Sequence, residues 1–453
     1  MSQIKTKVTI VPRKSTSNDD NLVWISNELF QKLHIKREQE FNVSLGKQNI
    51  MTKIKTINMA VNELSISECF IKDLCLPLKQ HTFQAKFDVE TTTLSLGPII
   101  GLLTDFNFKS QEEPNFRSIH SFCEELHHGI SEIGGFFYVF SDDEFSDQGY
   151  YLEEGKWTPF KVPLPDVVYN RVHSRNREKS SQFHSFRERL EQLKIPMFND
   201  RFLSKWDVYE QLIQENLLHS YIPDTKIFTK ENLEEFTQKY EMVFIKPIHG
   251  SQGKNILRLI RDQNGFNLKT SINSISNKIL TAESIEKMYK QLKKLQGNRI
   301  YIIQQGIHLM LNKNCPMDFR ALCHKNLKNQ WSVTSLIARI SHEDEFVSNI
   351  SRGGTIMKPH QALSENLEKE KAAEIILQMK KLSIETATTI STYSPGITGE
   401  LGIDIGVDKE GKLWLIEVNS KPSKNFDDGN RKIRPSAKAI IRFCTKLSIE
   451  KEE

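Results

Sequence analysis

Residues 400–422, ELGIDIGVDKEGKLWLIEVNSKP, contain two strand-like runs joined by a turn at residues 408–411. Alternate residues of a strand project to the same face, so Glu417 and Asn419 are expected to point together and Ile416 to point the other way. A hairpin that shows polar residues to water has the same pattern. The run LWLIEV is too apolar for such a hairpin, and buried carboxylates need a metal ion or a base as a partner.

The register of this hairpin decides whether a third oxygen ligand joins the pair. If a four-residue turn connects Val407 to Lys412, Asp404 lies opposite Leu415 and diagonal to Glu417, on the same face. Two carboxylates and an amide oxygen suit Mg²⁺, which prefers oxygen and is commonly held by one or two carboxylates in nucleotide sites. The hairpin is therefore a candidate magnesium site.

Upstream, residues 242–256, MVFIKPIHGSQGKNI, place Lys246 on an apolar strand and Gly250, Ser251 and Gly253 in the loop that follows. Backbone amides of such a loop can approach phosphate oxygens while the ammonium group neutralises them. The loop is not a Walker A motif, because its two glycines are too close together. Taken alone, the segment is equally well explained as an ordinary corner between two strands.

Three further segments between these two carry polar groups that suit phosphoryl transfer. RIYIIQQGI is a strand that ends in two glutamines, MDFRALCHK places an acid and an arginine on one face, and SLIARI leads into SNISRGG. Arg339, Asn349 and Arg352 are candidates for neutralising a transferring phosphoryl group. The other polar residues of these segments are Gln304, Gln305, Asp318 and Arg320.

In this order the segments resemble the ATP-grasp superfamily, and residues 97–446 resemble the YheC/YheD family of endospore coat-associated proteins. The resemblance implies that the phosphates of ATP contact a lysine at the start of a helix and a second lysine on a strand. It also implies that the glycine-rich loop closes over them and that residues 302–307 form the adenine hinge, where many relatives carry a glutamate. The implied nucleotide contacts are Lys205, Lys246, Gly250, Ser251, Gly253, Gln304, Gln305 and Ile307.

The same resemblance implies an ADP-forming carboxylate–amine ligase, which uses Mg-ATP to activate a carboxylate as an acyl phosphate for attack by an amine or a similar nucleophile. Two Mg²⁺ ions, for which Mn²⁺ can substitute, are then held by Asp404, Glu417 and Asn419, with Glu417 between them. The implied catalytic residues are Arg320, Asn349 and Arg352. Two alternatives stay open: an ATP-grasp kinase with a stable phosphoryl acceptor, and a nucleotide-binding structural coat protein without turnover.

The composition of the 453 residues is that of a multidomain globular protein. Apolar residues make up 38% and charged residues 26%, and 62 basic against 57 acidic residues give a formal charge of +5. The basic residues are spread along the chain, so no nucleic-acid partner is implied. The sequence has no CxxC pair, no HExxH motif, no signal-peptide pattern and no apolar run of membrane-spanning length. We therefore expect a cytoplasmic protein without a membrane partner, and the resemblance adds the spore and its coat proteins as location and partners.

Local patterns divide the chain into three expected domains. Residues 1–95 form short alternating runs, typical of a half-buried antiparallel sheet, and make a β-rich module. Residues 96–190 follow a strand–helix–strand order that predicts a small α/β domain, identified by the resemblance as a pre-ATP-grasp domain. Residues 191–447 form the expected ATP-grasp domain, in which a capping box, Ser204 to Asp207, precedes the helix at Lys205. The expected fold is thus a multidomain α+β and α/β protein.

The substrate side of the site has a weaker signal. Asn170, Arg171 and Arg175, at and just after the strand-like segment PDVVYNRV, are candidates for binding a substrate carboxylate. The run RNREKS is equally typical of a solvated charged turn, and we favour the turn.

Overall fold

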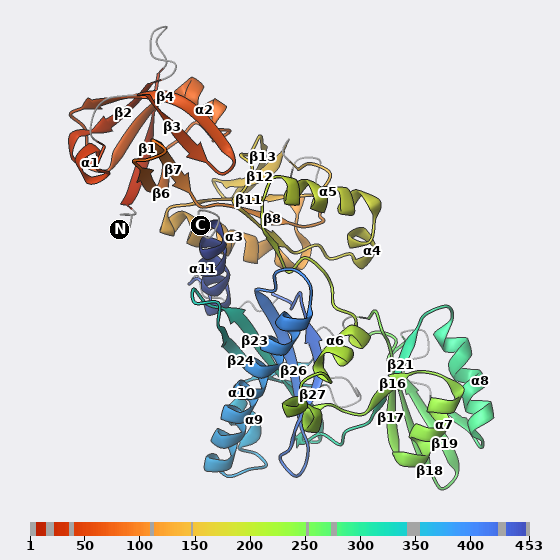
Figure 1. Ribbon diagram of the computed structural model, residues 1–453. Helices are drawn as coiled ribbons and strands as arrows, with labels where there is room; N and C mark the ends of the chain where they lie inside the picture. The colour runs from red at the N-terminus through yellow and green to blue at the C-terminus, as the bar shows by residue number, and fades with distance from the viewer. Residues whose placement is uncertain are drawn as a thin grey trace.

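The computed structural model describes residues 6–14, 22–35, 40–108, 113–145, 148–250, 253–272, 279–341, 354–424 and 432–449. Figure 1 shows them as a barrel at the N-terminal end, an α/β region in the middle of the molecule and two further sheets at the other end. These regions lie in chain order, except that the C-terminal helix returns to the middle region.

Seven strands close the N-terminal barrel in the order β1-β5-β2-β4-β3-β7-β6. Two short helices, α1 (Asn27–Lys32) and α2 (Glu68–Asp73), each begin at a serine whose hydroxyl accepts a backbone N–H. The strands are β1 (Thr6–Arg13), β2 (Leu22–Ser26), β3 (Glu40–Leu45), β4 (Gln48–Ile57), β5 (Glu63–Ser67), β6 (His81–Asp88) and β7 (Thr93–Gly97).

The expectation of an antiparallel sheet for this segment is wrong. β1 pairs in parallel with β5, β2 with β4 and β3 with β7, while pairs such as β3–β4 and β6–β7 are antiparallel. Alternation does place the side chains correctly: along β6, Phe83, Ala85 and Phe87 are buried. The alternating pattern gives no information about which strand pairs with which, because it specifies only the face of the sheet to which each side chain points.

The second region is a mixed sheet with helices on both faces, in the order β13-β12-β11-β8-β14-β15. Its strands are β8 (Ile99–Leu103), β11 (Phe136–Phe140), β12 (Gly149–Glu153), β13 (Lys156–Phe160), β14 (Val167–Asn170) and β15 (Met197–Phe198). β8, α3 (His120–Ile133) and β11 form the predicted strand–helix–strand unit, and β8 and β11 are parallel. Two short strands, β9 (Asn107–Phe108) and β10 (Pro114–Asn115), and the turn η1 (Arg117–Ile119) precede α3.

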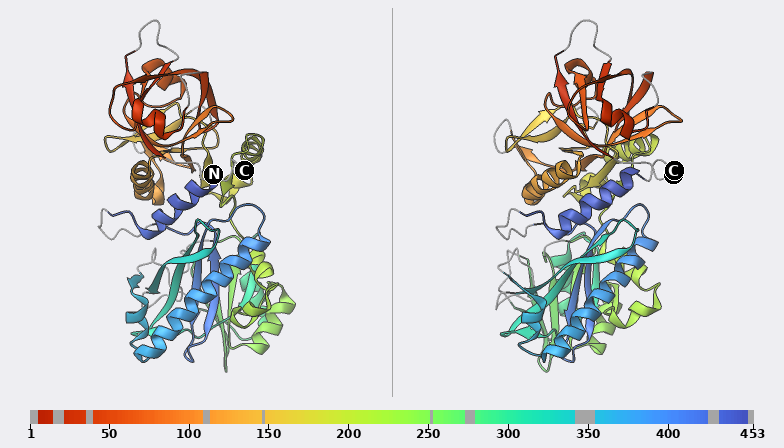
Figure 2. Two further views of the ribbon diagram at one scale, coloured as in Figure 1. Left: turned by 60° about the vertical axis from the view of Figure 1, so that its left-hand side comes forward. Right: turned by 90° about the vertical axis from the view of Figure 1, so that its left-hand side faces the viewer.

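Different helices cover the two faces of this sheet. On one face, α3 and the C-terminal helix α11 (Pro435–Ile449) pack together, with Phe122 and Ile440 in one hydrophobic cluster with Ile100. On the other face, α5 (Ser181–Gln192) contributes Phe186 to a cluster that includes Ile99 and continues into the barrel. Both views of Figure 2 show α11 crossing the middle of the molecule, between the α/β region and the two sheets beyond it.

The third sheet is antiparallel, in the order β16-β21-β17-β18-β19-β20, and α7 (Lys230–Lys239) and α8 (Ile285–Gln296) pack against one of its faces. Its strands are β16 (Thr225–Ile227), β17 (Met242–Pro247), β18 (Leu257–Asp262), β19 (Gly265–Thr270), β20 (Leu280–Ala282) and β21 (Tyr301–Gln305).

The fourth sheet has the order β25-β24-β23-β26-β27, and β22 (Leu311–Asn312) pairs with β23. The long helix α10 (Lys369–Tyr393) packs on one face together with α6 (Lys205–Leu212) and α9 (Pro359–Leu363). The strands are β23 (Cys315–Lys325), β24 (Trp331–Ile340), β25 (Thr355–Met357), β26 (Glu400–Val407) and β27 (Leu413–Asn419).

A buried carboxylate joins the second region to the fourth sheet. Glu400, which is fully buried at the start of β26, accepts hydrogen bonds from Tyr169 at 2.6 Å, from Arg171 at 3.3 Å and from Lys424. Its Oε1 also lies 2.8 Å from Nε2 of His324. Burial alone would raise the pKa of Glu400, but Lys424, His324 and Arg171 hold it well below its usual range. We call these five residues the Glu400 joint.

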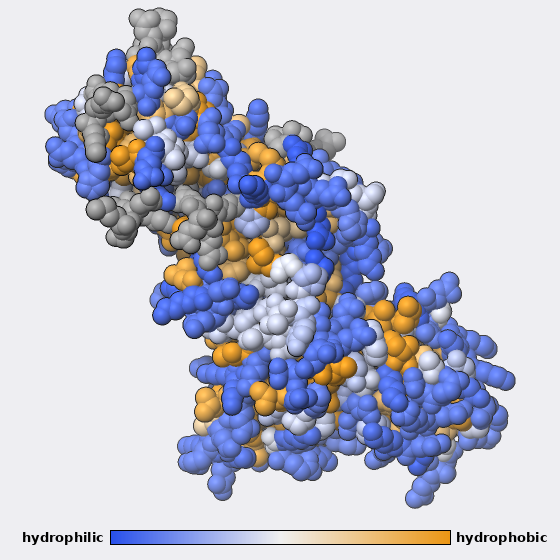
Figure 3. All heavy atoms as spheres, in the orientation of Figure 1, coloured by the Kyte–Doolittle hydropathy of each residue, from blue (hydrophilic) through white to orange (hydrophobic). Residues whose placement is uncertain are grey.

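The outer surface gives little further indication of function. Figure 3 shows mainly hydrophilic residues on the visible face, with hydrophobic residues in small groups. Within the described ranges, no helix is both long enough and apolar enough to cross a membrane.

Candidate active site

A cleft of about 860 Å³ is lined by the third and fourth sheets and by segments of the α/β region. Most of the residues predicted from the sequence lie together on its walls. They are Lys205, Lys246, Gly253, Gln304, Gln305, Ile307, Arg320, Asp404, Glu417 and Asn419.

The other four residues predicted for the nucleotide and catalytic sites are Gly250, Ser251, Asn349 and Arg352. Gly250 packs beside Pro247, whose ring a side chain at position 250 would meet, and it is not among the residues that line the cleft. Ser251, Asn349 and Arg352 lie outside the described residues, so their assignments stay predictions.

The hairpin of β26 and β27 forms as predicted, but with a different register. Asp404 lies opposite Glu417 and not opposite Leu415. The pairing is already shifted by one residue at the turn, where Val407 lies opposite Leu413 and not opposite Lys412, and a β-bulge after Asp404 adds a second residue. Ile416 and Glu417 both line the cleft, whereas Leu415 is buried in the core of the fourth sheet. The expectation that Ile416 points away from Glu417 is therefore wrong. Bulges are common beside active sites, where they re-aim a side chain.

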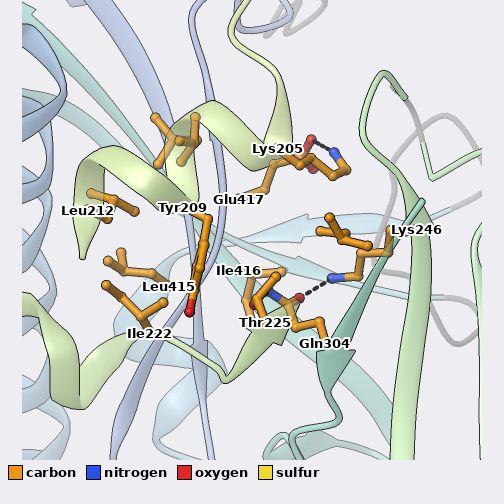
Figure 4. Close-up of a pocket in the computed structure, with 13 residues that line it drawn as sticks. Lys205, Tyr209, Leu212, Ile222, Thr225, Lys246, Gln304, Leu415, Ile416 and Glu417 are labelled. Atoms are coloured by element: carbon orange, nitrogen blue, oxygen red, sulfur yellow. Dashed lines mark hydrogen bonds and ion pairs between the residues drawn. The ribbon is translucent and has the colours of Figure 1, made fainter. Parts of the chain in front are cut away.

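Helix α6 positions the first lysine. Its N-terminus has the predicted capping box, in which Ser204 and Asp207 exchange hydrogen bonds between side chain and backbone. Lys205 is the first residue of the helix, and its Nζ donates to Oε1 of Glu417 at 2.5 Å. Figure 4 shows the two side chains reaching toward each other across the space between α6 and β27.

Strand β17 positions the second lysine. Phe244 and Lys246 line the cleft, while Ile245 between them is buried in the core. The Nζ of Lys246 donates to Oε1 of Gln304 at 2.7 Å, and Nε2 of Gln304 donates to the hydroxyl of Thr225 at 3.0 Å (Figure 4). Burial, and then the charge of Lys205, lower the pKa of Lys246 to about 8. An anionic ligand would therefore meet a lysine whose charge is not yet compensated.

A smaller, mostly apolar pocket of about 50 Å³ lies next to these lysines. Tyr209, Ile222 and Leu415 point into the space between α6 and β21, and Ile416 closes it on the side of the large cleft (Figure 4). The apolar pocket and the charged wall are thus adjacent, which suits a ligand with a flat apolar part and an anionic part.

Four buried charged residues form a network on β23, β24 and β26. Arg320 donates to both carboxylate oxygens of Asp404, and Arg339 donates to both oxygens of Asp318 at 2.6 Å. Arg339 also reaches Asp404 at 2.9 Å. Burial would raise the pKa of Asp404, but the two guanidinium groups lower it. The sequence indicates Asp318 and Arg339 only as supporting groups, whereas the structure brings both into the cleft.

The α/β region contributes a second basic wall. Arg171 lines the cleft and is buried, and Asn170 is fully buried. The charged run at residues 175–180, interpreted as a solvated turn, is half-buried to exposed. Arg175 begins the short helix α4 (Arg175–Glu178) and lies over the ring of Phe202 at 4.6 Å.

Three further basic residues that are not predicted from the sequence, Arg117, His173 and Lys421, line the cleft beside Arg171. Only His173 had a usable signal, because it closely follows the parallel strand β14. Residues just after the strands of a parallel sheet lie at the edge where such folds bind ligands.

Two antiparallel sheets that face a common cleft define an ATP-grasp fold. Lys246 lies on the third sheet, and the carboxylate-bearing hairpin lies on the fourth, with Lys205 of α6 beside it. The sequence profile of the family described as "YheC/D like ATP-grasp" matches residues 194–447, more than half of the chain. The chain therefore belongs to the YheC/D-like ATP-grasp family.

Individual relatives are distant. The endospore coat-associated protein YheD of Bacillus subtilis is 26% identical over 407 residues, which cover 88% of either chain. The endospore coat-associated protein YheC of the same organism is 24% identical over 300 residues, 65% of this chain and 80% of that one. Among solved structures, D-alanyl-alanine synthetase A of Vibrio cholerae superposes with a TM-score of 0.46 at 12% identity, over 78% of this chain and 98% of that one.

Proposed function

We propose that this chain is an Mg-ATP-dependent, ADP-forming ligase, which activates a carboxylate as an acyl phosphate and joins it to an amine or a similar nucleophile. The observation that carries the proposal is the convergence of two lysines, two carboxylates and two buried arginines on one cleft. Groups of this kind stabilise the charge of a transferring phosphoryl group. Membership of the ATP-grasp family supports the same chemistry. The names of the two Bacillus relatives support an association with the spore coat.

Lys205 and Lys246 hold the phosphates of ATP in this proposal. Their present partners, Glu417 and Gln304, are replaced by phosphate oxygens, with which an ammonium group forms strong charge-assisted hydrogen bonds. The loop at Gly253, which also lines the cleft, covers the phosphates and limits the access of water.

The adenine ring lies at the junction of the cleft and the apolar pocket. Ile307 and Ile416 offer apolar contacts there, and Gln304 and Gln305 offer side-chain amides at the end of β21. These residues take the position of the adenine hinge that the family resemblance implies.

The oxygen donors of the β26–β27 hairpin fit Mg²⁺. Glu417 and Asp404 face each other across the hairpin and Asn419 lines the same cleft, which gives a set of hard oxygen ligands. Among the described residues, no group of three or more His, Cys, Asp and Glu side chains is arranged for a metal ion. The set proposed here has two carboxylates and takes its third oxygen from the amide of Asn419. Asp404 would also keep Arg320 and Arg339 beside the metal. A bound Mg²⁺ ion would neutralise phosphate charge and act as a Lewis acid.

The reaction itself has two steps. A carboxylate oxygen of the substrate attacks the γ-phosphorus of ATP, the bond to the β-phosphate oxygen breaks, and ADP leaves. The nucleophile then attacks the acyl carbon, inorganic phosphate leaves, and the amine loses a proton. Arg320 stabilises the anionic acyl phosphate from its buried position on β23, and Asn349 and Arg352 are assigned to the same task.

Glu417 gives the first test. Glu417→Gln keeps the volume of the side chain and removes its charge, so phosphate release in a screen of carboxylates and amines should fall at least about 100-fold. Circular dichroism should match that of the parent protein. Turnover that persists in the folded variant excludes Glu417 as a metal ligand.

Isotopic labelling tests the order of the steps once a substrate is found. If the carboxylate is labelled with oxygen-18, one labelled oxygen should appear in the released phosphate. A stable phosphorylated product in place of a joined one would exclude the ligase and favour a kinase.

A further inference from the structure

The sheet of the α/β region reverses its strand order at β8. β11 lies on one side of β8 and β14 on the other, and both run parallel to it. In open parallel sheets, ligands bind outside the carboxyl ends of the strands at such a switch point. The segments that leave β8 and β14 at this edge are residues 104–105 and residues 171–173, and Arg117 and Ser118 lie just before α3.

Five side chains of this edge and of the segment after β27 line the large cleft. They are Arg117, Ser118, Arg171, His173 and Lys421, and we call them the switch-point wall. Lys205, Lys246 and Glu417 line the same cleft.

The acidic partners of the switch-point wall lie away from the cleft surface. Asp105 pairs with Arg117 at 2.9 Å, Glu400 pairs with Arg171, and Glu178 pairs with Lys421. None of these three described carboxylates is among the residues that line the cleft. The carboxylates therefore hold the cations in place, while the surface offered to a ligand is basic.

Arg171 has bonding capacity that the protein does not use. Its side chain is 5% exposed, and its two terminal nitrogens donate to Glu400 and to the carbonyl oxygen of Pro422. Its Nε–H is buried and has no hydrogen-bond partner among the described residues. A buried donor without a partner costs free energy, which an acceptor atom of a ligand that reached it would recover.

Arg117 and Lys421 are also held in fixed positions by the surrounding structure. The backbone of Arg117 is left-handed, with φ of 53°, which is uncommon for a residue other than glycine and is found at ligand clamps. The ammonium group of Lys421 donates to Glu178 and to the carbonyl oxygen of Val172, which uses two of its three N–H bonds. Ser118 adds a hydroxyl 3.3 Å from Nε2 of His173.

We propose that the switch-point wall binds a second anionic group of the substrate, a carboxylate or a phosphate, while the reacting carboxylate lies beside Arg320. The substrate is then an acidic compound with at least two anionic groups. This inference rests on the proposed ligase function for the identity of the reacting group. Anion binding by the wall is supported separately by the switch point, by the Nε–H of Arg171 and by the position of the basic side chains in the cleft.

Calorimetry on the full chain saturated with Mg-ADP tests the wall. The probes are glutarate, 4-phosphonobutyrate, which replaces one carboxylate of glutarate by a phosphonate, and butyrate, which lacks the second anionic group. Glutarate or 4-phosphonobutyrate should bind at least about tenfold more tightly than butyrate, because one charged hydrogen-bonded contact is worth that much. Whichever of the two binds more tightly identifies the group as a carboxylate or a phosphate.

Arg117→Gln supplies the decisive variant, because the side chain of Arg117 is 42% exposed and its loss should not unfold the protein. Affinity for the tighter dianion should fall about 10- to 100-fold, with the affinity for Mg-ADP unchanged. Lys409→Gln is the matched control: Lys409 is an exposed cation of the same cleft, at the β26–β27 turn, and its replacement should leave probe affinity unchanged.

The outcomes separate this inference from the proposed function. If the dianions bind no better than butyrate, or if Arg117→Gln binds them as the parent protein does, the switch-point wall does not bind an anionic group. The ligase proposal is not affected by that result. If Mg-ADP does not bind the parent protein, the proposed function fails. In that case the same probes are titrated without nucleotide. Weaker binding of the dianions by Arg117→Gln than by the parent protein would still support anion binding at the switch-point wall.

Discussion

The barrel and the cleft handle charge in opposite ways. In the barrel, inward side chains such as Val8 and Ile10 are apolar, and the ion pair of Lys53 and Glu40 stays at the surface, with 64% and 63% of the side chains exposed. In the cleft, Arg320 and Asp404 pair with only 10% and 5% exposed. An exposed pair contributes little stability, whereas a buried pair costs several kcal/mol per ion in desolvation before its attraction is counted.

This difference indicates where the molecule has given up stability for function. A barrel held together by hydrophobic burial needs no charge inside, and none of the described Asp, Glu, Lys and Arg residues of the barrel is buried. Buried carboxylates and cations are retained around the cleft because a charged ligand or a joint between regions requires them. Three of the four predictions that follow change the charge of the buried Glu400 or of the half-buried Lys246, and the fourth changes an apolar residue of the barrel.

The Glu400 joint should give the largest effect. Glu400→Ala leaves Arg171, Lys424 and His324 buried without their carboxylate, and the loss of one partner of a buried pair costs about 3–5 kcal/mol. Hydrogen exchange should show faster opening of β14 and β26, with the barrel unaffected. Glu40→Ala, which removes an exposed carboxylate of the barrel, is the control and should change neither region.

Phe83→Ala should produce a similar loss in the barrel by a different mechanism. Phe83 is fully buried on β6, and removal of a buried phenylalanine ring costs about 3–5 kcal/mol. Faster hydrogen exchange should be confined to the barrel and the adjoining α/β core, and Mg-ADP affinity should not change. A change in nucleotide affinity would contradict the separation of the barrel from the cleft.

Lys246 should affect binding more than stability. Lys246→Met keeps an apolar stem on β17 but removes a charge-assisted contact, so Mg-ADP should bind about 10- to 100-fold more weakly. Calorimetry measures this directly, and Lys409→Gln serves again as the control. Equal affinity in the folded variant and the parent protein would remove Lys246 from the nucleotide site.

The sequence predicts the local features of the cleft well, because they depend on neighbours in the chain. The strand that carries Lys246, the capping box before Lys205 and the hairpin of Glu417 and Asn419 are all present in the structure. The family resemblance also gives the ATP-grasp fold, which the family profile confirms.

Features that depend on distant residues could not be predicted. The bulge at Asp404 changes the register without any change in the alternating pattern on which the prediction rested. Arg171 is charged and follows a strand, which is typical of a surface residue, and its burial depends on Glu400, 229 positions away. The parallel strand pairs of the barrel could not be predicted for the same reason. An alternating pattern predicts which side chains face the core, but it does not predict which strand lies next to which.

The smallest effect, and the one most specific to the cleft, is a dependence of nucleotide affinity on pH. The pKa of Lys246 is lowered to about 8 in the free protein, and phosphate oxygens beside it should raise that pKa in the complex. Below pH 8 the lysine is protonated before and after binding, so affinity is at its highest. As the pH rises through 8, the free protein loses the proton that the complex keeps, and Mg-ADP affinity should fall about tenfold by pH 9.

Calorimetry of the parent protein and of Lys246→Met from pH 7 to 9 measures this dependence. Titrations at pH 9 in two buffers of different ionisation enthalpy should show uptake of close to one proton by the parent protein and none by the variant. An affinity that falls equally in both proteins would assign the titration to another group. An affinity that rises with pH would contradict the lowered pKa, because deprotonation of Lys246 in the free protein can only weaken its attraction for phosphate.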